Sequence, residues 1–267
     1  APPPPISQAV PRSRNDSDSL DGWLLASLPP PREAPVASPL GLTPPRAVTR
    51  PSPSKGDYVK HGVNFSHLLE DAEFERWDAA TAEDLQFYLE QTGSFLAEYQ
   101  QDGRTAAQII AGAARDHEVN PWVILATLEK ESSLVSHTGK PPRGRLKSAM
   151  GFGFDDGGSH PGKKTSFAFQ VERGTALLRE LFEEGRQMSF PRKMTVDFGQ
   201  RKLTVRNAAT HALMRYTPHT TDTSLPRTGG GNYLFRKHFE RMQKGYARFY
   251  EQAQPTRVAG PDTSLPS

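Results

Sequence analysis

Hydrophobic residues recur with a helical spacing of three or four over most of the chain after residue 66, which is typical of helices with one buried face. These apolar stripes lie at 85–89, 109–114, 124–135, 171–182, 209–216 and 235–249. Residues 194–206 alternate apolar and polar side chains instead, with Gly199 between the two runs, and this indicates a β-hairpin. The pattern predicts a mainly α fold of the α+β class, with about six helices and one small hairpin.

Polar residues and proline mark where several of these helices begin. Thr81 and Asp84 precede one apolar run, while Thr105 and Gln108 form a capping-box pattern before another. The sequence Asn120-Pro121 places proline in a first turn, where its missing N–H costs nothing. We therefore expect helices to begin after residues 81, 105 and 120, and another to begin after Asn207.

The two ends of the chain differ in composition from the middle. Fourteen of the 24 prolines lie within residues 1–53, and such a segment has too little apolar surface to offset its chain entropy. We predict a disordered tether over 1–55, a catalytic domain over 56–252 with a helical lead-in at 56–103, and a disordered tail over 253–267. The sequence has no initiator Met and no signal-peptide pattern at Ala1, so we expect a processed or trimmed form.

The overall charge and composition narrow the possible partners. The chain of 267 residues has a net charge of +3 and no cysteine, which excludes disulfides and thiolate metal sites. No stretch approaches the roughly 20 apolar residues of a membrane span. No base-reading motif or basic strand with interleaved aromatics is present, so we expect no nucleic-acid partner. Basic residues near 140–147 fit either a solvated loop or a loop that faces an anion.

A carboxylate stands on the apolar side of one predicted helix. In the stretch "LEKESSLVS", Glu131 projects on the same side as Ile124 and Leu128, whereas Lys130 points the opposite way and Glu129 lies at the edge. A carboxyl group buried without a partner retains its proton near neutral pH and can act as a general acid. The alternative is that Glu131 pairs with an Arg or Lys side chain.

Several blocks of sequence, in order, resemble a bacterial lysozyme-like family similar to the lytic transglycosylases and glucosaminidases. The blocks are "NPWVILATLEKESSLVS" (120–136), "AMGFGFDD" (149–156), "FAFQVERGTALLRELF" (167–182), "NAATHALMRYTPHT" (207–220) and "GGNYLFRKHFERM" (230–242). The resemblance covers about residues 66–250. It implies a two-lobed helical fold around a cleft that holds a glycan strand.

The resemblance also implies a set of site residues. Glu131 matches the catalytic acid of the family, and Ser132 is its companion. The remaining expected substrate-binding residues are Met150, Gly151, Phe152, Gly153, Asp155, Tyr216, Asn232 and Tyr233. We expect no cofactor and no metal, because His211 and His219 lack a third ligand at a suitable spacing. The rings of Phe152 and Phe154 either stack on sugars or pack in the core.

The expected reaction is cleavage of the β-1,4 bond between N-acetylmuramic acid and N-acetylglucosamine in peptidoglycan. Glu131 would protonate the glycosidic oxygen and then act as a base. Without a second carboxylate, the muramoyl 6-hydroxyl attacks and the enzyme is a lytic transglycosylase. With Asp155 or Asp156 opposite the acid, the carboxylate separation decides between retention and inversion.

Two other functions remain open at this stage. The chain could be a cell-wall binding module that has lost turnover, because fold does not guarantee chemistry. It could also be an endo-β-N-acetylglucosaminidase that acts on other glycans. In each case a peptidoglycan or glycan partner implies a periplasmic, cell-surface or secreted location.

Overall fold

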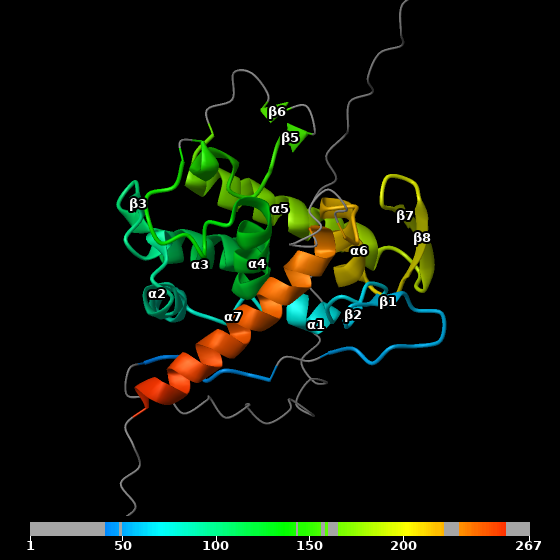
Figure 1. The fold of residues 1–267 in the computed structure, drawn as a ribbon, viewed down its shortest axis with the longest axis horizontal. Coiled ribbons are helices and arrows are strands. Elements are labelled where there is room, and N and C mark those ends of the chain that lie inside the picture. The colour runs from blue at the N-terminus through cyan, green and yellow to red at the C-terminus, as the bar shows by residue number, and fades with distance from the viewer. Residues whose placement is uncertain are drawn as a thin grey trace, which may run out of the picture. The chain divides into compact units, whose positions relative to one another are not determined.

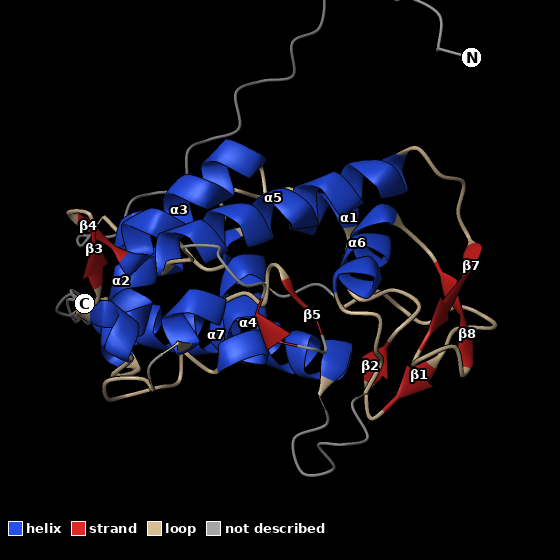
Figure 2. Ribbon diagram, turned by 90° about the horizontal axis from the view of Figure 1, so that it is seen from above, coloured by secondary structure: helices blue, strands red, loops and turns tan. Residues whose placement is uncertain are grey.

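The computed structural model describes residues 41–47, 50–142, 144–155, 158–159, 165–221 and 230–254. All of them belong to one unit, Pro35–Ser267, whereas a second unit, Ala1–Ala34, lies outside the described residues. The described part is mainly helical and its short strands form only antiparallel pairs (Figures 1 and 2). The mainly α fold that the sequence predicts is confirmed.

Helices form the framework of this unit. The α-helices are α1 (Asp71–Phe74), α2 (Ala82–Gln91), α3 (Ala106–His117), α4 (Pro121–Ser132), α5 (Phe167–Arg186), α6 (Ala208–Tyr216) and α7 (Gly231–Ala253). Two 3₁₀ turns, η1 (Phe95–Ala97) and η2 (Arg145–Ser148), lie between them. The paired strands are β1 (Val59–Lys60) with β2 (Val63–Asn64), β3 (Gln100–Gln101) with β4 (Arg104–Thr105), β5 (Phe154–Asp155) with β6 (Gly158–Ser159), and β7 (Arg192–Val196) with β8 (Arg201–Val205).

The α4 helix lies at the centre of the fold. It packs against α7, α3 and η2. Every residue from Pro121 to Glu129 is buried. A helix that is apolar all round is one that neighbours cover on all sides. The long α5 helix packs on α3 and α6, and it closes the core opposite α7 (Figure 2).

The helix starts follow the sequence signals. Thr81 and Thr105 each close a full capping box, with Asp84 and Gln108 respectively. The Asn120 side chain accepts a hydrogen bond from the N–H of Trp122, with Pro121 in the first turn. Asn207 caps α6 in the same way. These predictions are confirmed, because a cap depends only on residues within one turn.

The predicted hairpin is also present. Its strands β7 and β8 pair antiparallel from Arg192 opposite Val205 to Val196 opposite Arg201. The turn between them has positive φ values at Asp197, Phe198 and Gly199, and Phe198 extends outward with 77% of its surface exposed.

The chain before residue 55 contacts the helical unit in its later part. Leu42 is buried, and the Tyr246 hydroxyl donates to the carbonyl oxygen of Thr43 at 2.7 Å. The proposed tether, catalytic domain and tail remain predictions, and the lead-in at 56–103 contains short strands besides α1 and α2. No helix in the described ranges is both long and apolar enough to cross a bilayer.

Candidate functional site

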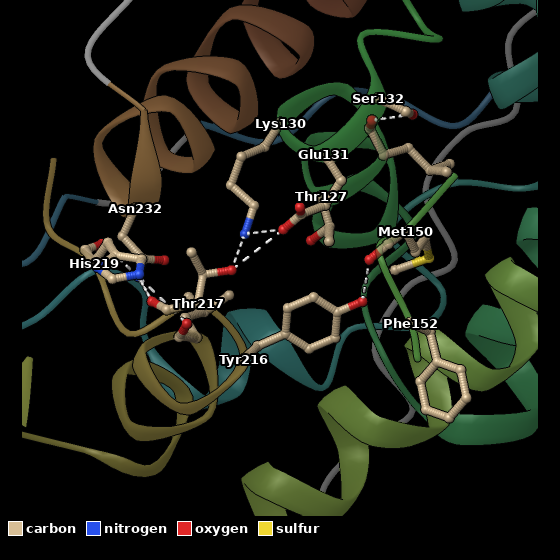
Figure 3. A network of polar contacts seen from close by, with 12 residues as sticks. Thr127, Lys130, Glu131, Ser132, Met150, Phe152, Tyr216, Thr217, His219 and Asn232 are labelled. Carbon is tan, nitrogen blue, oxygen red and sulfur yellow. Dashed lines mark hydrogen bonds and ion pairs between the residues drawn. The ribbon is translucent and has the colours of Figure 1, made fainter. Parts of the chain in front are cut away.

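The candidate site lies at the last turn of α4, where the helix emerges beside the loop that follows α6 (Figure 3). The Lys130 ammonium contacts Glu131 Oε1 at 2.8 Å. It also donates to the Thr217 hydroxyl at 2.5 Å. The Thr217 hydroxyl in turn donates to Glu131 Oε1 at 3.3 Å. One oxygen of Glu131 is therefore fixed by two neighbours.

The burial of the two glutamates is the reverse of the prediction. Glu129 has only 4% of its side chain exposed, whereas Glu131 has 26%. Glu129 accepts hydrogen bonds from the Ser136 N–H at 2.9 Å and from Arg241 at 3.3 Å. The helical-wheel argument assumes one covered face, and it fails here because α4 is covered on every side until its final turn.

The predicted position of Lys130 is wrong as well. Its side chain is 6% exposed and turns toward Glu131 rather than away from it. The ammonium also lies 5.4 Å from the centre of the Tyr216 ring, where the negative face of an aromatic ring attracts a cation. The alternative that Glu131 pairs with a basic residue is the one found, and the general-acid argument loses its premise of an unpaired buried acid.

Tyr216 positions the segment that faces the acid. Its hydroxyl donates to the Met150 carbonyl oxygen at 2.7 Å, and burial, together with the nearby charge of Glu131, raises the pKa of Tyr216 well above its usual value. Tyr216 therefore stays a hydrogen-bond donor at any ordinary pH. Tyr216 is partly buried and packs against the core, and its expected role in substrate binding stays a prediction.

Gly151 lies next to Oε2, the second carboxylate oxygen of Glu131. Its φ is +72°, and a Cβ atom there would lie 3.2 Å from Glu131 Oε2. Glycine permits both the left-handed backbone and the close approach. Among the described residues, no hydrogen-bond donor reaches Oε2. This oxygen is an acceptor that a bound molecule can use.

The other expected residues near Glu131 make contacts within the fold. The Ser132 hydroxyl donates to the Leu128 carbonyl oxygen at 2.8 Å and does not orient Glu131. Met150 is fully buried. The Phe152 ring packs edge-on against Phe169 at 6.2 Å between centroids. Gly153 has a positive φ of +76° in the turn before β5.

Asp155 belongs to β5, but its side chain lies outside the described part of the chain, as do the side chains of Phe154 and Asp156. A second carboxylate opposite Glu131 is therefore untested.

Asn232 and Tyr233 begin α7 next to the loop that bears Thr217. The buried Asn232 amide donates to the carbonyl oxygens of Thr217 at 2.7 Å and His219 at 3.2 Å. It holds that loop in place. Tyr233 is half-buried, with the Lys237 ammonium 5.5 Å from its ring centre. Asn232 is thus a positioning residue. The sequence alone could not tell this role from a role in binding.

The sequence analysis missed three residues that contact either Glu131 or the loop after α6. Lys130 was placed on the wrong face, and Thr217 and Phe198 were not singled out. Thr217 follows Tyr216 directly, so its closeness to Glu131 follows once Tyr216 is placed there. Phe198 gives only a weak signal, since an aromatic residue in an Asp-Phe-Gly turn is unusual. Within the described ranges, no group of three His, Asp or Glu side chains could hold a metal ion.

Comparison with known proteins gives one match. A family model described as "LasA, N-terminal domain" matches residues 67–259, which is more than half of the chain. No curated protein and no solved structure matches the chain. LasA is related to staphylolytic peptidases, and its family relates this chain to cell-wall-active proteins.

This match overturns the resemblance to the lysozyme-like and lytic transglycosylase families, to which the LasA N-terminal domain does not belong. The blocks behind that resemblance coincide with buried helices and close helix contacts. A Cβ atom on Gly174, for example, would lie 2.8 Å from the Cβ of Met150. Constraints of this kind recur in unrelated helical folds, and they do not specify a reaction.

Proposed function

Since the chain belongs to the LasA N-terminal domain family, we propose that it is a non-catalytic domain that binds bacterial peptidoglycan. The binding surface is the end of α4 with the loop after α6, and Glu131 is the main recognition group. The chain acts outside the cytoplasmic membrane in a secreted or cell-surface protein.

One observation carries this proposal. The Glu131 carboxylate is held by Lys130 and Thr217 through Oε1, while Oε2 faces Gly151 without a donor from the described residues. A fixed acceptor of this kind suits the amide N–H and hydroxyl groups of N-acetylated sugars and peptide stems. It suits proton donation poorly, because an ion pair with an ammonium requires the carboxylate form.

Sedimentation with purified peptidoglycan tests the proposal. The wild-type chain should pellet with the wall, and Glu131→Ala should weaken binding at least about tenfold, as expected for a lost hydrogen bond to a charged group. Glu251→Ala is the matched control, because Glu251 is an exposed glutamate on α7. A wild-type chain that stays in the supernatant, or equal losses in both variants, would contradict the proposal.

A second candidate is cleavage of the glycan, with Glu131 as general acid and base. Its support is the closeness of Glu131 to Tyr216 and to Gly151. In this case Lys130 would have to release Glu131 when the glycan binds. Cleavage leaves new chain ends: anhydro-muramoyl ends from transglycosylation, and reducing ends from hydrolysis.

A further inference from the structure

The β7–β8 hairpin exposes an aromatic ring in a conformation that costs free energy. Among the described residues, Phe198 has the most exposed large apolar side chain, at 77%. Its φ is +54°, a region that bulky L-residues seldom adopt. One exposed phenylalanine is ordinary by itself. An exposed phenylalanine in a strained turn is a candidate for a binding role.

The turn that carries Phe198 is fixed to the loop after α6. The Asp197 carboxylate accepts hydrogen bonds from the N–H of Thr220 at 2.6 Å and from its hydroxyl at 2.7 Å. The Asp197 N–H donates to the carbonyl oxygen of Pro218 at 2.8 Å. Arg201 pairs with the same carboxylate at 3.0 Å. The backbone of the turn is therefore held in a defined place, and little backbone entropy is lost when Phe198 binds a ligand.

The same loop connects Phe198 to the Glu131 site. The His219 ring lies 4.2 Å from the Phe198 ring between centroids, at an angle of 39°. Two residues earlier, the Thr217 hydroxyl donates to Glu131 Oε1. Figure 3 shows His219 and Thr217 on this loop, with Lys130 and Glu131 beside Thr217. The loop after α6 thus contacts the Phe198 ring through His219 and the Glu131 carboxylate through Thr217.

We propose that Phe198 is a sugar-stacking residue, against which a pyranose ring of the bound glycan lies. This inference rests on the proposed function and extends it, because it assigns the glycan rather than the peptide stem to the part of the surface around Phe198. The C–H bonds of a pyranose face carry partial positive charge and are attracted to the negative face of an aromatic ring. The hydroxyl and acetamido groups of a neighbouring sugar then have His219 and Glu131 as partners.

A protein partner fits this surface less well. A stable protein interface buries about 800 Å² on each side around an apolar centre. Phe198 instead stands beside imidazole, hydroxyl and carboxylate groups. The other exposed large apolar residues among those described, Val59 and Trp77, are each only 45% exposed.

Titration calorimetry with peptide-free glycan strands, prepared from peptidoglycan with an amidase, tests the inference. Phe198→Asn removes the ring and keeps a residue that tolerates positive φ. We expect its affinity to fall about three- to tenfold, the size of one aromatic contact. Phe198→Tyr retains the ring and should bind within about twofold of wild type, as should Trp77→Ala, which removes an exposed ring elsewhere.

Thermal unfolding of the same variants separates binding from folding. Phe198→Asn relieves backbone strain, so its melting temperature should equal that of the wild type or exceed it by about 1–4 °C. A purely structural role for Phe198 would lower the melting temperature instead, and this result would overturn the inference.

The binding outcomes also separate the inference from the proposed function. If Phe198→Asn binds the strands as wild type does while Glu131→Ala is impaired, the stacking role is wrong and the proposed function stands. If Phe198→Asn loses binding to intact peptidoglycan but not to peptide-free strands, Phe198 contacts peptide and the inference is wrong. If the wild-type chain binds neither material, both proposals fail.

Discussion

The pairing of Lys130 with Glu131 can be measured with a double-mutant cycle. Lys130→Met removes the charge and retains most of the apolar stem, and Glu131→Gln retains the shape of the acid without its charge. Each single variant should destabilise the domain. Glu131→Gln should cost more, because it leaves the ammonium of Lys130, whose side chain is 6% exposed, without an opposite charge.

The size of the coupling follows from the geometry. Two unit charges 2.8 Å apart interact by about 6 kcal/mol at an effective dielectric constant of about 20. Removing Lys130 from water offsets part of this energy, and the 26% exposure of Glu131 screens another part. Exposed pairs couple by about 0.2–1 kcal/mol and well-desolvated pairs by several. We therefore expect a coupling of about 1–2.5 kcal/mol.

Urea unfolding at neutral pH, followed by circular dichroism, gives the free energies of unfolding for the four proteins. Equal slopes with urea would show that the variants unfold from comparable states. Most of the coupling should persist at high salt, because one partner is buried. A coupling below about 0.3 kcal/mol would mean that the ion pair does not form in solution, and the description of the site would then be wrong.

Three further predictions concern the scaffold around the site. Gly112→Ala should stabilise the domain by about 0.5–1 kcal/mol through helix propensity, since nothing lies within 4 Å of the position that its new Cβ atom would take. Gly174→Ala should instead destabilise the domain by about 1–2 kcal/mol, because its Cβ atom would clash with Met150. Urea unfolding of the two variants separates helix propensity from steric contact. Burial lowers the pKa of His238 to about 4, so the unfolded state binds more protons and stability falls as the pH drops below about 6.5. Between pH 7 and pH 4.5, His238→Gln should therefore lose about 2 kcal/mol less free energy of unfolding than the wild type does, and an identical fall would refute this assignment. Asn232→Ala should lower the free energy of unfolding by about 1–2 kcal/mol, because the carbonyl oxygens of Thr217 and His219 lose their side-chain donor and keep only a backbone N–H donor each. A loss under about 0.5 kcal/mol would contradict the role of Asn232 in holding this loop.

Local signals in the sequence predict much of the fold. The capping boxes at Thr81 and Thr105 and the β7–β8 hairpin depend on residues close together in the chain, and all are present. The hydrophobic period likewise identifies the helices that form the core.

The site was less predictable because it depends on contacts between distant segments. The direction of Lys130 is decided by Thr217 and Tyr216, which are more than 80 residues away in sequence. The burial of Glu129 depends on Arg241 from α7. Neither contact leaves a periodic pattern in α4, so a wheel drawn for that helix alone placed the wrong acid inside.

The central claim is that the Glu131 surface binds peptidoglycan without cleaving it. Mass spectrometry of the soluble fraction, after prolonged incubation of the chain with purified peptidoglycan, tests this claim most directly when the bound protein is quantified in the same sample. We predict that the chain is found on the wall and that no new reducing or anhydro-muramoyl ends appear. Release of fragments with such ends, abolished in Glu131→Gln while that variant still pellets with the wall, would contradict the claim.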